Sequence, residues 1–149
     1  MSNLQKSIKV DDILYFLGDL TFKRETAIKF FEMLDGVEIH YIIGNHDSRE
    51  VVDIANRFCS SVTGLIDIRI QDQSITLCHY AMRVWNKSHF NAWQLYGHSH
   101  GGLDSIGKQY DVGIDNNNYH PISFENLKVA MEKRPDNFNY IAPEKRRPV

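Results

Sequence analysis

Apolar runs alternate with helical patterns along the first half of the chain. Residues 13–17 form a compact apolar run that ends in Gly-Asp, which predicts a buried strand. Residues 23–35 follow with apolar side chains at helical spacing, and residues 37–43 predict the next strand. Asp47 or Ser48 can cap a further helix, and Asp47 with the glutamate three residues later has the spacing of a capping box. This alternation predicts a layered α/β or α+β domain.

The middle of the chain has a different pattern. Residues 65–70 alternate between apolar and polar side chains, and residues 74–78 follow after a short polar turn, so we expect an antiparallel hairpin. Residues 82–93 predict a mostly irregular segment with some helix. Short strands are expected at residues 94–96 and 108–114, before a final helix.

The final helix and the tail complete the predicted domain. Pro121 and Ser123 open the helix, whose apolar face includes residues 124, 127 and 131. Residues 134–149 contain several prolines and are expected to lie over the surface, with residues 145–147 as a basic end.

Length and charge narrow the class of protein. The 149 residues suit a single domain spanning 1–149, without an apolar run of the roughly 18 residues that a membrane span needs. Seventeen Lys and Arg against nineteen Asp and Glu give a net charge of −2, which predicts no strong nucleic-acid surface. Cys59 and Cys78 are too few for a disulfide scaffold, and no signal peptide begins the chain, so we expect a cytoplasmic protein.

Four short polar clusters follow predicted strands. They are Gly18–Asp19, Gly44–Asp47, His79 and Gly97–His100. Side chains at the carboxyl ends of strands converge in open α/β sheets, and imidazole, carboxylate and amide oxygen suit a transition metal. Alternation on a strand places His98 and His100 on one face, which suits a metal.

These clusters resemble, in order and spacing, the last four motifs of the calcineurin-like metallophosphoesterases. That family's pattern is D-x-H, G-D, G-N-H-[DE], a lone His and G-H-x-H, and the likeness to its small phage and bacterial members covers about residues 8–131. The resemblance implies a sandwich of mixed β-sheets flanked by helices.

The resemblance also implies a set of metal ligands. Asp19 is similar to the carboxylate that bridges two metals, and Asn45, His79 and His98 are similar to the other ligands of the second metal. His100 is similar to a ligand of the first metal. The implied cofactor is one or two divalent transition metal ions, foremost Mn²⁺, with Fe²⁺, Zn²⁺ or Ni²⁺ as alternatives.

A phosphoesterase reaction follows from the same resemblance. His46 is similar to the histidine that contacts phosphate and acts as the general acid, while Asp47 would orient its ring. Hydroxide activated by the metal would attack phosphorus in a phosphodiester or nucleotide substrate. Asn45, Tyr80 and Arg83 are further candidates for substrate binding.

One motif of the family is missing. No histidine precedes His40, so D-x-H is absent and we expect the chain to lack the first strand of the fold, beside residues 13–17. The first metal would then keep only Asp19 and His100. Three alternatives stay open: an enzyme of weakened activity, a scaffold or inhibitor that binds a protein partner, and a truncated form completed in trans. The missing strand also makes a homodimer more plausible than usual.

Overall fold

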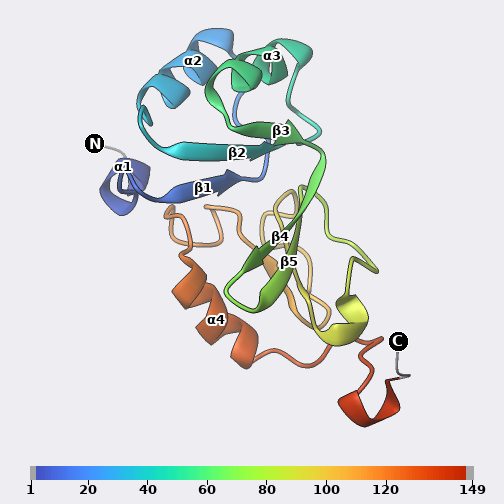
Figure 1. The fold of residues 1–149 in the computed structure, drawn as a ribbon. Coiled ribbons are helices and arrows are strands. Elements are labelled where there is room, and N and C mark those ends of the chain that lie inside the picture. The colour runs from blue at the N-terminus through green and yellow to red at the C-terminus, as the bar shows by residue number, and fades with distance from the viewer. Residues whose placement is uncertain (1–2, 147–149) are drawn as a thin grey trace.

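Two β-sheets, each packed against helices, make up the molecule (Figure 1). The computed structural model describes residues 3–146. The mixed α/β class expected from the sequence is confirmed. Within the described residues, every helix is too short or too polar to traverse a lipid bilayer.

The N-terminal sheet is parallel and has the order β1-β2-β3. Its strands are β1 (Ile13–Phe16), β2 (Glu38–Ile42) and β3 (Ser61–Thr63). Helices α2 (Arg24–Glu32) and α3 (Arg49–Phe58) connect them and cover one face of the sheet (Figure 1). Both helices and the first two strands lie where the sequence predicts them. The short strand β3 was not predicted.

Aromatic and aliphatic side chains fill the space between this sheet and its helices. Phe31 of α2 and Tyr41 of β2 are fully buried, together with Ile54 and Ala55 of α3. Ser48 caps α3, since its side chain accepts a hydrogen bond from the backbone nitrogen of Val51. Of the two residues proposed for the cap, Ser48 is therefore the one used.

The C-terminal sheet has the order β4-β5-β6-β7. Strands β4 (Leu65–Ile70) and β5 (Gln73–Cys78) form the predicted antiparallel hairpin, while β6 (Trp93–Tyr96) and β7 (Gln109–Asp111) continue the sheet in parallel. The last strand is shorter than the predicted 108–114, because it ends at Asp111 and turns begin at Ile114.

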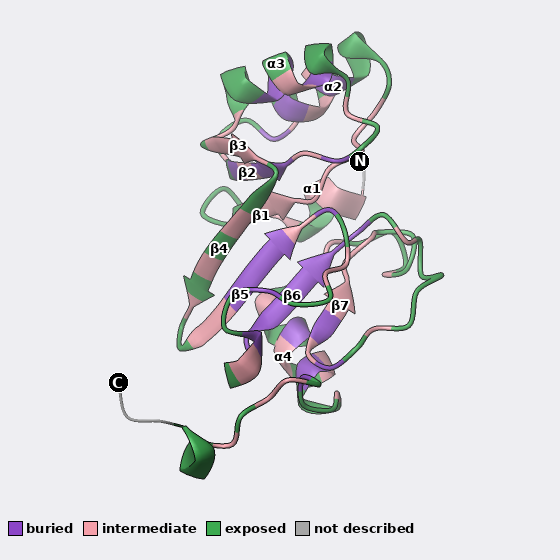
Figure 2. Ribbon diagram, turned by 90° about the vertical axis from the view of Figure 1, so that its right-hand side faces the viewer, coloured by how far each residue is buried: buried purple, intermediate pink, exposed green. Residues whose placement is uncertain are grey.

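A second core joins the two sheets. Ile75 and Leu77 of β5 alternate with polar residues and pack with Leu95 of β6, Ile42 of β2 and Leu127 on helix α4 (Phe124–Glu132). Figure 2 shows β5 and β6 as the buried centre of the C-terminal sheet. Ile42 belongs to this core, so the second core extends from the C-terminal sheet to the N-terminal one.

The remaining elements are single turns: α1 (Asn3–Ser7), η1 (Ser88–Phe90) and η2 (Pro143–Lys145). The expected surface tail is more firmly held than its sequence suggests. Asn137 is only 3% exposed, and its side chain bonds the backbone of Ser88, Ala92 and Lys108. Arg147 of the proposed basic end lies outside the described residues.

Candidate metal centre

The loops that follow β1 and β2 touch each other, and two glycines permit the contact. A Cβ atom on Gly18 would overlap the backbone nitrogen of Gly44, and one on Gly44 would overlap the carboxylate of Asp19. Gly18 also has a positive φ of 82°, which L side chains rarely adopt. The glycines of the two predicted motifs therefore let the Asp19 and Asn45 loops approach closely.

Asp47 joins these two loops. Its carboxylate accepts hydrogen bonds from the backbone nitrogens of Gly44 (2.8 Å), Asp19 (3.0 Å) and Leu20 (3.2 Å), and from the Tyr41 hydroxyl (2.7 Å). Burial and the acceptor Asp47 raise the pKa of Tyr41, so the hydroxyl keeps the proton that it donates. These four donors occupy both carboxyl oxygens of Asp47, and the expected contact with the His46 ring stays a prediction.

His79 is buried between the two sheets with both ring nitrogens facing oxygen atoms. The residue is 2% exposed, and Nδ1 lies 2.6 Å from the carbonyl oxygen of Leu17, to which it donates. Nε2 lies 3.0 Å from Asn45 Oδ1 and 3.2 Å from Asp19 Oδ2. A ring that donates from Nδ1 has an acceptor at Nε2 in its neutral form. Nε2 of His79 and the oxygens of Asp19 and Asn45 are then all acceptors that face one another, unless a proton or a cation lies between them.

His98 adds a second imidazole at the same place. Its ring is edge-on to His79 with the centroids 5.2 Å apart, and the residue is exposed. Asp19, His79 and His98 each offer a ligand atom, and these atoms lie within 4.8 Å of one another. Two imidazoles, a carboxylate and the nearby Asn45 amide oxygen suit a borderline divalent metal.

The backbone at two of these residues is strained. Asp19 has a φ of 57° and His98 a φ of 62°, in the left-handed region that non-glycine residues seldom occupy. Such conformations cost on the order of 1–3 kcal/mol and concentrate at functional sites. Six other described non-glycine residues, His100 among them, also have a positive φ, so this strain accompanies the site but does not by itself mark it.

His100 does not join this cluster. Strand β6 ends at Tyr96, and the following residues turn, so the expectation that His98 and His100 share one strand face is wrong. The side chain of His100 is 78% exposed and its Nδ1 bonds Asp115 Oδ2. The hydrogen bond and charge of Asp115 raise the pKa of His100 above its usual value. No signal in the sequence identified Asp115 as its partner.

The three substrate-binding candidates outside the ligand set lie in different surroundings. The backbone nitrogen of His46 donates to Asp19 Oδ1 at 2.8 Å, and its exposed side chain lies beside Phe22. Tyr80 is edge-on to the His98 ring, with centroids 4.9 Å apart. Arg83 instead stacks its guanidinium over the Phe138 ring of the tail, 4.2 Å from the centroid.

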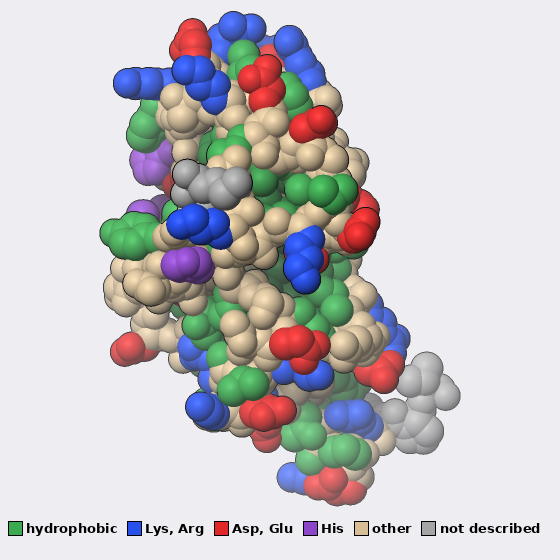
Figure 3. Space-filling model, turned by 90° about the vertical axis from the view of Figure 1, so that its left-hand side faces the viewer, with side chains coloured by type: hydrophobic (Ala, Val, Ile, Leu, Met, Phe, Trp, Pro, Cys, Tyr) green, Lys and Arg blue, Asp and Glu red, His purple; other side chains and the backbone are tan. Residues whose placement is uncertain are grey.

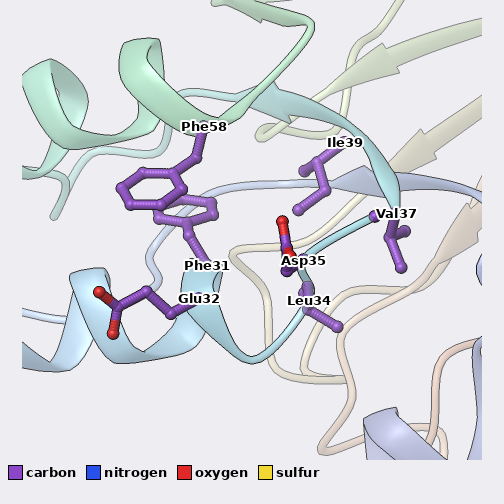
Figure 4. Close-up of a pocket in the computed structure, with 8 residues that line it drawn as sticks. Phe31, Glu32, Leu34, Asp35, Val37, Ile39 and Phe58 are labelled. Carbon is purple, nitrogen blue, oxygen red and sulfur yellow. The ribbon is translucent and has the colours of Figure 1, made fainter.

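A pocket of about 300 Å³ lies elsewhere, between the end of α2 and the start of β2 (Figure 4). Its lining includes the stacked rings of Phe31 and Phe58, and its titratable groups are Glu32 and Asp35. Nearby Cys59 has its pKa raised to about 11 by burial, which keeps the thiol protonated and a poor nucleophile. Metal-ligating chemistry therefore concentrates at Asp19 and the histidines, not in this pocket.

Two proteins to which this chain is similar are described as uncharacterized or of unknown function. No model of a known protein family matches it. The uncharacterized protein MJ1445 of Methanocaldococcus jannaschii is 28% identical over 148 residues, which cover 89% of this chain and 73% of MJ1445. The crystal structure of the protein of unknown function AQ665 from Aquifex aeolicus has a TM-score of 0.65 at 22% identity, covering 86% of this chain and 81% of that chain. This likeness supports the fold alone.

Proposed function

We propose that the chain is a metal-dependent phosphoester hydrolase of the calcineurin-like fold. The observation that carries the proposal is the orientation of buried His79, whose Nε2 points at Asp19 and Asn45 while Nδ1 is held by the carbonyl of Leu17. Metal-bound histidines commonly donate their second nitrogen to a carbonyl or carboxylate, which fixes the tautomer. The proposed ligands are Asp19, Asn45, His79 and His98, and the proposed ion is Mn²⁺.

The proposal is for one ion per chain. His100, the remaining ligand candidate, is largely exposed and lies outside the group of side chains whose ligand atoms gather within 4.8 Å of one another. A second ion would therefore have Asp19 as its main protein ligand, which is too few for tight binding by a borderline metal. The structure of the site thus favours the one-metal form among the alternatives that the sequence leaves open.

The chain's own residues would orient the phosphoester and supply a proton. A bound ion would contribute Lewis-acid activation of water and of a phosphoryl oxygen. His46 follows Asn45 directly, its backbone nitrogen donates to Asp19 Oδ1, and its side chain is exposed. From there its imidazole can contact phosphate and protonate the leaving oxygen.

Metal binding and hydrolysis test the two halves of the proposal separately. We expect purified protein to retain close to one Mn²⁺ per chain in equilibrium dialysis, and to hydrolyse bis(p-nitrophenyl) phosphate. His79→Ala should lower metal affinity and activity by at least about 10- to 100-fold, because a direct ligand is lost. The matched control is His89→Ala in η1, a histidine outside the cluster.

The outcomes are distinct. Equal metal affinity in His79→Ala and His89→Ala would overturn the proposed site. If the protein binds a metal tightly but does not hydrolyse the substrate with Mn²⁺, Fe²⁺, Zn²⁺ or Ni²⁺, the hydrolase function is overturned. The scaffold alternative is then favoured. Normal hydrolysis by His46→Ala would remove His46 from the proposed reaction while leaving the metal site intact.

A further inference from the structure

Two exposed aromatic rings contact histidines of the candidate site, Phe22 at His46 and Tyr80 at His79 and His98. Phe22 is 77% exposed, more than any other large hydrophobic residue among those described, and Tyr80 is 46% exposed. The Phe22 ring is edge-on to His46, with centroids 5.5 Å apart, and the Tyr80 ring is edge-on to His98. Figure 3 shows histidine side chains at the surface with hydrophobic side chains next to them.

The two rings come from different sheets. Phe22 lies in the loop between β1 and α2, which belongs to the N-terminal sheet, whereas Tyr80 follows β5 of the C-terminal sheet. Asp19 and Asn45 approach the cluster from the first sheet, and His79 and His98 approach it from the second. Each sheet therefore contributes proposed ligands and one exposed aromatic ring to this part of the molecule.

Both rings are attached to backbone that is held in place. Two residues before Phe22, the nitrogen of Leu20 donates to Asp47, and the helix α2 begins at Arg24 two residues after it. The carbonyl of Tyr80 accepts a hydrogen bond from the side chain of Gln94, which is fully buried. The exposure of these rings is therefore not a consequence of loose loops. Keeping this apolar surface in water costs free energy.

Held aromatic rings beside a phosphate site suit a ligand with a flat group next to its phosphate. A base stacked on an aromatic side chain gains affinity without regard to its hydrogen-bonding edge, since every base has a π face. We infer that Phe22 and Tyr80 bind the nucleobase of a nucleotide phosphodiester whose phosphate lies at the cluster. This inference rests on the proposed hydrolase function.

Two esters with one leaving group test the inference. Thymidine 5′-(p-nitrophenyl) phosphate and methyl p-nitrophenyl phosphate both lose p-nitrophenolate as water adds to phosphorus, giving thymidine 5′-phosphate or methyl phosphate. Their chemistry at phosphorus is matched, and only the first carries a base. We expect the wild-type protein with Mn²⁺ to prefer the thymidine ester about tenfold in kcat/KM, the gain typical of one stacked base.

Ring-specific variants identify the residues. Phe22→Leu and Tyr80→Leu keep apolar bulk without a flat face, so we expect each to reduce the preference about fivefold or more. Phe22→Tyr and Tyr80→Phe keep the ring and should retain it. Phe90→Leu, which removes an exposed ring in η1, is the matched control and should also retain it.

The results separate the two proposals. Equal kcat/KM for both esters in the wild type, or a preference that survives in both leucine variants, would overturn the stacking inference and leave the hydrolase intact. Hydrolysis of neither ester with any of the four metals would overturn the hydrolase function, and the inference with it.

Discussion

At the scale of single residues, Gly44 lets Asp19 reach its position. A Cβ at residue 44 would overlap the carboxylate of Asp19, so Gly44→Ala must displace a proposed ligand. We expect metal affinity to fall by about tenfold or more, measured by calorimetric titration with Mn²⁺. Gly64→Ala is the control, since nothing lies within 4 Å of its Cβ. Equal affinities in the two variants would contradict the proposed role of Asp19.

His100 provides a prediction about pH. Asp115 raises the pKa of His100, so the ion pair stabilises the fold fully below pH 6.5, the usual pKa of the ring, and is lost as pH rises through the raised value. Asp115→Asn should lower the pKa of His100, measured by NMR titration of the ring protons. Asp53→Asn on α3 is the control. An unchanged pKa in Asp115→Asn would show that the pair does not form in solution.

Residue identity predicts which side chains gather at the candidate site better than it predicts their contacts. The motifs around Asp19, Asn45 and His79 gave candidates that the fold brings together. The role of Asp47 was not predictable in the same way, because two of its four donors, the backbone nitrogens of Asp19 and Leu20, lie 28 and 27 residues away along the chain. His100 was misplaced because strand alternation was extended past Tyr96, where the backbone turns.

At the scale of elements, the N-terminal cap of α3 can be tested directly. The Ser48 side chain accepts from the Val51 nitrogen, one of the donors that lack a partner within the helix. Ser48→Ala should lower the free energy of unfolding by about 1 kcal/mol, measured by urea denaturation. Lys23→Ala at the start of α2 is the control, because the Lys23 side chain makes no capping bond. An equal loss in both variants would refute the cap.

Periodicity explains which elements were predictable. The hairpin β4–β5 and helices α2, α3 and α4 are long enough for an apolar pattern to repeat, and they lie close to their predicted ranges. The three-residue strand β3 is too short to show a period, and its pairing with β2 depends on the path of α3. Asn137 is buried through hydrogen bonds to three backbone groups, a form of burial that hydrophobic patterns do not reveal.

At the scale of the whole molecule, the proposed metal site connects the two sheets. Asp19 and Asn45 follow strands of the N-terminal sheet, whereas His79 and His98 follow strands of the C-terminal sheet. The strand pattern alone predicts that each side chain follows a strand, whereas the meeting of these loops is expected only from the family resemblance. Ile42 of the N-terminal sheet packs into the second core, so apolar contacts connect the two sheets without any ligand. A metal bound at the site would connect the two sheets through its ligands, in addition to the apolar contacts of the second core.

This arrangement predicts that metal binding stabilises the native state of the whole domain. An ion that binds only the folded chain adds RT ln(1 + [L]/Kd), or about 2.7 kcal/mol at a hundredfold excess over Kd. We therefore expect Mn²⁺ to raise the Tm by several degrees in calorimetry, and EDTA to reverse the rise. Asp19→Asn should lose the shift because it removes the carboxylate that faces His79. Asp72→Asn, in the exposed turn of the hairpin, should keep it. An equal shift in both variants would place the bound ion elsewhere on the protein.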